Sequence, residues 1–424
     1  MRLKLLTVAL ALAATPFASH AEDLLDAYRQ ARANDPVLSQ ADSTRLSVGE
    51  NVNQARALLL PQVNGSLALN QSNPAGPDRT VLTDAAGNPI TDTAGNPLLS
   101  GDIGHTRTRT LQATVSQSVV DFSKYADLKA AKSSSAAQDA TYEAALQQLA
   151  TRVATAYFQV LTNDDALTFA KANEQALARQ LEQAQQRFDV GLSAITDVQD
   201  AKAQHDTSVA AVITAENTLS DSREALTQIT GKPADNLKKL REQLPMDAPS
   251  PNDPQAWVAE AVKSSPSIIS AQYNVDSAEH TISSARAGHL PTIDAGVTYS
   301  KSSAWYQNGG STAATNSLNS SNGRGNTTVG LTLNVPIFSG GATQSRVRQS
   351  IYQRDAAQDS LESVRRQVVR DTLNYYRSVV AGISKVSATK AAVESSESAR
   401  DATQAGFEVG TRTIVDVLIA QQNL

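Results

Sequence analysis

The residues of this chain that are best placed to do chemistry lie in a motif that occurs twice, at residues 188–198 and 407–417. The shared pattern is Phe-x-Val-Gly, three variable residues, and then Ile-x-Asp-Val. Each copy puts a carboxylate, Asp197 or Asp416, in the first turn of the helix that we expect after the Val-Gly break. A negative charge there stabilises a helix. The second copy adds Arg412, whose guanidinium can make charge-assisted hydrogen bonds to a neighbouring helix.

No catalytic signature accompanies the motif. The sequence has no Gly-x-Ser-x-Gly, P-loop, paired-histidine zinc motif or calcium-binding loop. The five histidines are scattered and are expected to be surface or packing residues: His20, His105, His205, His280 and His289. We therefore expect no enzyme activity, no cofactor and no metal site. The net charge of −5 gives no argument for a nucleic-acid partner.

The duplication extends beyond this motif. Leu60-Pro61 pairs with Leu290-Pro291, and Phe122-Ser123 pairs with Phe338-Ser339, in the same order along the chain. The spacing between the copies changes only across a loop rich in Gly, Pro, Asn and Asp, roughly residues 72–105, as expected because loops absorb length changes. We predict two structural repeats separated by a Pro-rich linker, with the bounds 22–230, 231–254 and 255–424. The second repeat ends at Leu424, partway down its last helix, which suggests a fragment.

Residues 1–21 read as a secretory signal. Arg2 and Lys4 precede an apolar stretch at residues 5–14, and Ser19-His20-Ala21 has the small-x-small form of a cleavage site. The chain has no cysteine and therefore no disulfide framework. The rest of the sequence has no apolar run long enough for a transmembrane helix. We expect an exported protein that begins near Glu22.

Very long helices are expected in both repeats. Residues 123–190 contain neither Pro nor Gly and are rich in strong helix formers, so one helix would extend about 100 Å. Ser123 is the expected N-cap and Gly191 the expected stop. The counterpart, residues 342–409, is interrupted only by Gly382. Further helices are predicted at residues 24–58, 194–230, 255–287 and 413–424. Helices of this length favour coiled-coil packing.

Four segments between the helices alternate apolar and polar residues: 63–69, 111–119, 293–299 and 329–337. Their length and period fit transmembrane β-strands, and they also fit a soluble antiparallel sheet with one wet face. Export, a long polar loop at one end of each hairpin, and Phe122 and Phe338 at the strand–helix junctions favour the membrane. Four strands cannot close a membrane barrel, and open edges are not tolerated in lipid. Membrane-spanning strands therefore require an oligomer that shares one barrel.

Together the signal segment, the duplicated helix–hairpin–helix–helix unit, the Leu-Pro before a strand and the paired motif closely resemble the TolC family of outer-membrane channels. The stretch at residues 409–418, Val-Gly-Thr-Arg-Thr-Ile-Val-Asp-Val-Leu, is highly specific. The resemblance implies an α+β membrane protein, in which three subunits with four transmembrane β-strands each share a twelve-stranded barrel. It also implies a long α-helical periplasmic barrel, with residues 231–254 in an equatorial belt.

The resemblance further implies a passive exit duct for a tripartite efflux pump or a type I protein secretion system. The implied partners are a periplasmic adaptor, an inner-membrane pump of the ABC, RND or MFS type, and outer-membrane lipid. A different interpretation, a soluble periplasmic coiled-coil adaptor or scaffold, explains the helices and the export but leaves the four alternating segments without a role.

In that family the helices after the two Val-Gly breaks close the periplasmic end. The matching gate residues here are Thr196, Asp197, Arg412 and Asp416, with Asp200 and Phe407 secondary. We expect Arg412 to bond Thr196 and Asp197, and Asp416 to form an acidic ring. Phe407 stands where the family often has Tyr, and Ile419 where a second carboxylate is common. The alternative is that Asp197 and Asp416 only cap or charge their helices.

Overall fold

The computed structural model describes residues 22–72, 80–100, 106–234, 236–241, 246–306, 323 and 325–424, which form two compact units. Unit 1 comprises residues 1–46, 137–272 and 360–424, and unit 2 comprises residues 47–136 and 273–359. Each unit therefore draws on both predicted repeats. The expected signal segment at residues 1–21 lies outside the described residues.

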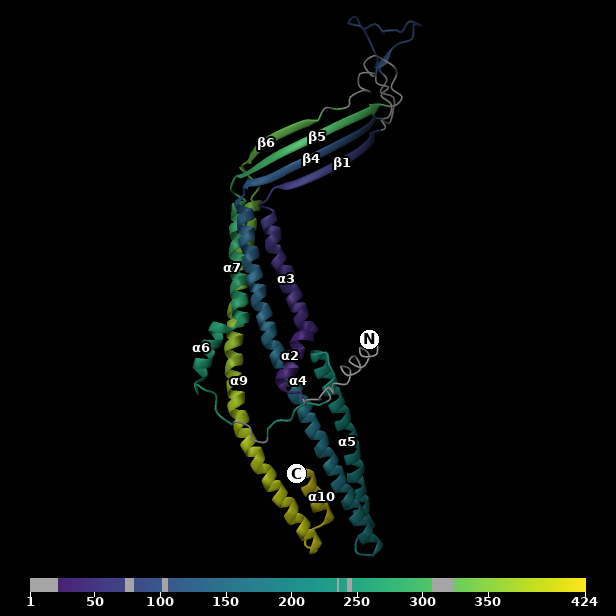
Figure 1. The fold of residues 1–424 in the computed structure, drawn as a ribbon, viewed down its shortest axis with the longest axis vertical. Coiled ribbons are helices and arrows are strands. Elements are labelled where there is room, and N and C mark those ends of the chain that lie inside the picture. The colour runs from purple at the N-terminus through teal and green to yellow at the C-terminus, as the bar shows by residue number, and fades with distance from the viewer. Residues whose placement is uncertain are drawn as a thin grey trace, which may run out of the picture. The chain divides into compact units, whose positions relative to one another are not determined.

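Unit 2 contains a four-stranded antiparallel sheet with the order β1-β4-β5-β6 (Figure 1). The strands are β1 (Gln62–Ser72), β4 (Thr106–Val120), β5 (Thr292–Tyr306) and β6 (Asn326–Asn334). Each predicted repeat supplies one hairpin, and β4 and β5 join the two hairpins. The four alternating segments are thus strands of one sheet. The prediction that the last strand extends to Ile337 was wrong, because Pro336 has no N–H to donate to the ladder and β6 ends at Asn334.

Next to the helices, the register places apolar residues on one face of the sheet and polar residues on the other; nearer the loops, Arg107, Arg109 and Lys301 lie on the same face as the apolar row. One row across the four strands is Val63, Val115, Val297 and Val329. The next row, on the opposite face, is Asn64, Thr114, Thr298 and Thr328. Alternate strand residues point to opposite faces, so a register that matches apolar with apolar residues produces this separation. Val63 and Val329, at the two ends of the apolar row, are 73% and 74% exposed in the described part of the chain.

The loop between β1 and β4 contains two consecutive turns of the same sequence type, at residues 83–90 and 91–98. In the first turn the Asp84 carboxylate accepts hydrogen bonds from the backbone N–H groups of Ala86 and Asn88, both at 2.9 Å. Asp92 does the same in the second turn. These hydrogen bonds lower the pKa of both carboxyl groups. The short strands β2 (Thr80–Val81) and β3 (Leu99–Ser100) pair at the base of the two turns.

Eight helices are described, and four of them, α4, α5, α9 and α10, match their predicted extent to within one residue at each end. They are α2 (Leu24–Asn34), α3 (Pro36–Ala57), α4 (Phe122–Asp189), α5 (Ile195–Thr230), α6 (Pro254–Ser264), α7 (Pro266–Ala287), α9 (Ala342–Glu408) and α10 (Ile414–Asn423). α9 continues through Gly382 without a break. In the described residues no helix is both apolar enough and long enough to cross a membrane.

Three local predictions about the helices were wrong. The expected single helices 24–58 and 255–287 are each divided, at Asp35-Pro36 and Ser265-Pro266. The residue before a proline is disfavoured in the helical region, and both Asp35 and Ser265 are extended. Ser123 is not the N-cap of α4, because the Asp121 carboxylate accepts from the Ser123 backbone N–H at 3.0 Å and helix α4 begins at Phe122.

The main core of unit 1 lies where α4 packs on α2 and α5. Leu149 and Val153 are fully buried there. Asp35 is a buried carboxylate beside this core, and it accepts from the Leu38 N–H at 2.9 Å and pairs with Arg152 at 2.5 Å. The carboxylate therefore both caps α3 and attaches it to α4.

The linker between the repeats is held by the first described residues. The Glu22 N–H donates to the Asn236 carbonyl at 3.0 Å, and the Lys238 N–H donates to the Glu22 carbonyl at 2.9 Å. The Tyr157 hydroxyl lies 2.7 Å from the Lys238 carbonyl, and burial raises the pKa of this tyrosine. The linker is thus held against α4 by the Tyr157 side chain, which bonds to the backbone of the linker.

Candidate functional site

Both copies of the repeated motif form the same turn in unit 1. Gly191 and Gly410 both have φ of 78°, a left-handed conformation that glycine adopts without strain. In each turn the N–H one residue past the glycine bonds back to the last helical turn: Leu192 to the Arg187 carbonyl at 2.8 Å and Thr411 to the Gly406 carbonyl at 2.9 Å. The motif therefore ends a long helix and starts a new one, as the sequence predicted.

The two carboxylates of the motif have different surroundings. Asp416 forms a capping box with Thr413, since its carboxylate accepts from the Thr413 N–H at 3.0 Å and the Thr413 hydroxyl accepts from the Asp416 N–H at 3.2 Å. The hydrogen bond from the Thr413 backbone is the main cause that lowers the pKa of Asp416. In the first copy Ala194 takes the N-cap position and has no side chain that can cap α5, so Asp197 stays in the first turn without a capping box.

Phe407 lies inside a small core rather than at the surface. Its side chain is buried with Leu177 of α4 and with three residues of α10: Ile414, Val417 and Leu418. The guanidinium carbon of Arg187 lies 4.8 Å from the centre of the Phe407 ring. Such a cation–π contact stabilises by about 0.5–2 kcal/mol, depending on solvent exposure. The ring thus attaches the end of α4 to the α9–α10 turn.

Arg187 was missed at the sequence level, although a signal was present. The first copy has arginine at position 187 and serine at 193, whereas the second has Gly406 and Arg412 at the matching positions. A side chain on Gly406 would place its first carbon 2.7 Å from the Arg412 Cγ. The bend of Arg412 over the turn therefore requires glycine at 406.

The predicted gate residues do not all meet within one copy. In the part of the chain that the structure describes, no hydrogen bond or ion pair joins Arg412 to Thr196 or Asp197. Arg412 instead lines a groove of about 380 Å³ between α9 and α10, together with Asp416 and Ile419. Thr196 and Asp200 are exposed, and Asp197 is half-buried.

The two expected interface aromatics lie at the junctions of strand and helix. Phe122 begins α4 directly after β4 and is 54% exposed. Phe338 lies between β6 and α9 and is 88% exposed. Their contact with lipid remains a prediction. Among the described residues no cluster of His, Asp and Glu could hold a metal ion.

A four-stranded sheet with one apolar face and very long duplicated helices defines the fold of TolC-like outer-membrane channels. The crystal structure of the outer membrane protein VceC from Vibrio cholerae matches with a TM-score of 0.72 and 18% identity, over 95% of this chain and 89% of that one.

The chain belongs to the outer membrane efflux protein family, which matches residues 27–232 and 257–424. It is 37% identical to the outer membrane protein TolC of Escherichia coli over 99% of this chain and 81% of that protein. It is 26% identical to the proteases secretion protein PrtF of Dickeya chrysanthemi, over 100% of this chain and 87% of PrtF. Membership in this family places the protein in the outer membrane.

The contact between Arg187 and Phe407 gives a prediction for the local stability of the turn. Phe407→Leu keeps an apolar side chain but removes the ring, so residues 404–418 should open more often and exchange backbone hydrogens about twofold to tenfold faster. Phe188→Leu is the matched control, because Phe188 occupies the corresponding place in the first turn and is 37% exposed. Hydrogen–deuterium exchange read by mass spectrometry measures both. Equal exchange in the two variants would contradict a role for the ring.

Proposed function

We propose that three copies of this chain form a passive exit duct in the outer membrane. The observation that supports this most strongly is the sheet, which has an uncovered apolar face and two open edges, β1 and β6. In lipid, unpaired backbone groups at such edges cost several kcal/mol each, so the edges must pair with another chain. Three copies supply twelve strands, which exceeds the eight that the smallest membrane barrels need.

The duct serves a tripartite efflux pump or a type I secretion system. The family is described as one of efflux proteins, and PrtF is named for the secretion of proteases. The chain carries no motif for ATP or proton coupling, so energy comes from an inner-membrane pump of the ABC, RND or MFS type. A periplasmic adaptor joins that pump to the helical part of the duct. A soluble adaptor or scaffold, the alternative, would have no use for an uncovered apolar sheet face.

The gate operates between copies. Among the described residues Arg412 forms no ion pair within its own copy, although its charge acts on the nearby Asp416, and we expect its guanidinium to reach Thr196 and Asp197 of a neighbouring copy. Three such links hold the α5 and α10 ends together until the adaptor breaks them. Capping lowers the pKa of Asp416, so its carboxylate stays ionised to a lower pH than an ordinary aspartate, and three copies form an acidic ring that favours cations.

Engineered cysteines can test the shared barrel, since the natural chain has none. Val63→Cys on β1 combined with Val329→Cys on β6 should let a short bifunctional maleimide link neighbouring chains, with dimers and trimers on a denaturing gel. The control pair is Val115→Cys and Val297→Cys, which face each other within one chain and should give only an internal link. Absence of any species larger than one chain in the edge pair would contradict the shared barrel.

The gate link is tested by single-channel conductance in planar bilayers. Arg412→Ala should raise the open population about tenfold or more, since a hydrogen bond to a charged group contributes about 1.5–3 kcal/mol. Arg400→Ala is the control, because Arg400 lies on α9 and pairs with its neighbour Asp401. The link is ruled out if the conductance of Arg412→Ala equals that of the unmodified chain.

The acidic ring predicts block by multivalent cations. Asp416→Asn should weaken block by hexamminecobalt(III) about tenfold or more, because the ring loses one charge from every copy. Asp401→Asn removes a carboxylate on α9 instead and should leave the block unchanged. Bilayer titrations give the blocking constants. An undiminished block in Asp416→Asn would place the cation site elsewhere.

A further inference from the structure

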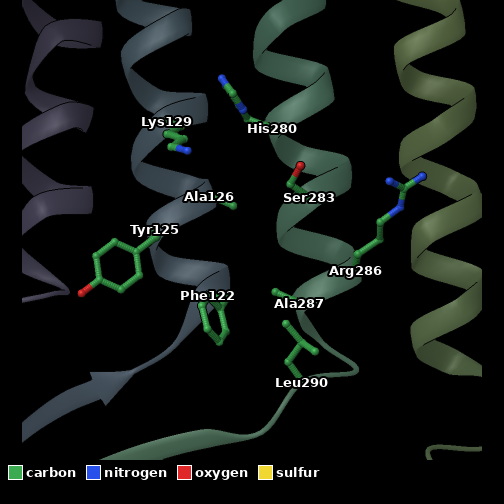
Figure 2. Close-up of a pocket in the computed structure, with 9 residues that line it drawn as sticks. All are labelled: Phe122, Tyr125, Ala126, Lys129, His280, Ser283, Arg286, Ala287 and Leu290. Atoms are coloured by element: carbon green, nitrogen blue, oxygen red, sulfur yellow. The ribbon is translucent and has the colours of Figure 1, made fainter.

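A pocket of about 480 Å³ lies between α4 and α7 in unit 2, next to the sheet (Figure 2). It is lined by Phe122, Tyr125, Ala126, Lys129, His280, Ser283, Arg286, Ala287 and Leu290. None of these residues belongs to the duplicated turns or to the predicted gate. Phe122 alone has been named before, as an expected interface aromatic. The pocket belongs to the segment where the strands change into helices.

The lining is sorted by polarity along the two helices. Phe122 and Leu290 lie at the end next to the strands, and Lys129 and His280 lie about two helical turns further along and face the space between α4 and α7 (Figure 2). Two turns correspond to about 10 Å. Arg286 leaves α7 on the side away from α4 (Figure 2). One end of the pocket is thus apolar and the other is basic.

The basic end has no compensating charge. No carboxylate lines the pocket. In the described chain, the side chains of Lys129, His280 and Arg286 have no ion pair and no hydrogen bond to another residue of the protein. Three donors without an acceptor around one pocket are complementary to an anion.

The two helices that line this pocket are flanked by other helices of the same copy and do not follow the free edges of the sheet. α7 and α4 are in direct contact, since the Ser277 hydroxyl donates to the Ala130 carbonyl at 3.0 Å. α3 flanks α4 at Gly49 and Ser135, and the end of α7 meets α9 where a side chain at Gly288 would lie 3.1 Å from Thr343. The free edges of the sheet are β1 and β6, whereas α4 and α7 continue the two inner strands.

We propose that this pocket binds an anionic phospholipid of the outer membrane, with its phosphate beside Lys129 and His280 and an acyl chain along Phe122 and Leu290. Arg286 also lines the pocket and adds a second permanent positive charge, although its side chain leaves α7 on the side away from α4 (Figure 2). The apolar end of the pocket next to the strands and the basic end further along the helices match the two ends of a phospholipid, whose acyl chains would enter the membrane beside the strands. Basic pockets between helices at a membrane surface recognise lipid head groups in this way. The proposal rests on the proposed insertion of the sheet in the membrane.

Native mass spectrometry of the full-length protein in detergent tests the proposal, with phosphatidylglycerol as the anionic probe and phosphatidylethanolamine as the zwitterionic comparison, whose ammonium group compensates its phosphate. About one phosphatidylglycerol per chain should be retained. The double variant Lys129→Gln/Arg286→Gln should bind it about tenfold or more weakly. The control is Lys132→Gln/Arg346→Gln, which removes the same charge from α4 and α9 in unit 2. Both of its residues lie outside the pocket, so this variant should bind as the unmodified chain does.

Equal retention of the two lipids, or equal retention by the two double variants, would overturn the proposal. A change in assembly mass in the pocket variant without a change in lipid binding would also overturn it, because the pocket would then be a contact between copies. Bilayer conductance of the unmodified chain separates failure of the lipid site from failure of the proposed duct. If the unmodified chain conducts and the lipid result is negative, only the lipid site fails.

Discussion

The requirement that backbone hydrogen-bonding groups be paired in lipid governs this protein. One chain builds a sheet with an apolar row across all four strands, and such a row is stable only against lipid or another apolar surface. Among the described residues, the outer edges of β1 and β6 have no partner strand. Water can satisfy such edges and hydrocarbon cannot. Under the proposed function, membrane insertion and edge pairing between copies must therefore occur together.

The duplicated framework suits the geometric demands of the proposed duct, and the differences between the repeats supply its proposed gate. Both repeats end a long helix with a glycine at φ 78° and restart it after the same turn. The arginines occupy different positions in the two turns, Arg187 in the first and Arg412 in the second. Arg187 stacks on Phe407 and holds the two turns together, whereas Arg412 forms no ion pair among the described residues of its own copy. In the proposed gate, attachment within a copy and locking between copies are thus divided between two cations.

Much of this fold could be predicted from the sequence because the signals are local and periodic. The dyad alternation gave the four strands and their faces, and the absence of Pro and Gly gave the extent of α4. Errors arose at single residues, where one backbone group decides the outcome. Asp35 and Ser265 break their helices because proline follows, and Asp121 takes the capping position assigned to Ser123. The contact of Arg187 with Phe407 and the pocket between α4 and α7 join residues far apart in sequence, so no local pattern contains them.

The mass of the detergent-extracted assembly tests the central claim most directly, because edge pairing of four-stranded sheets fixes how many copies close the barrel. Native mass spectrometry under conditions that preserve bilayer conductance should give three chains per particle. A conducting particle with any other number of chains, or a single chain that conducts, would contradict the account.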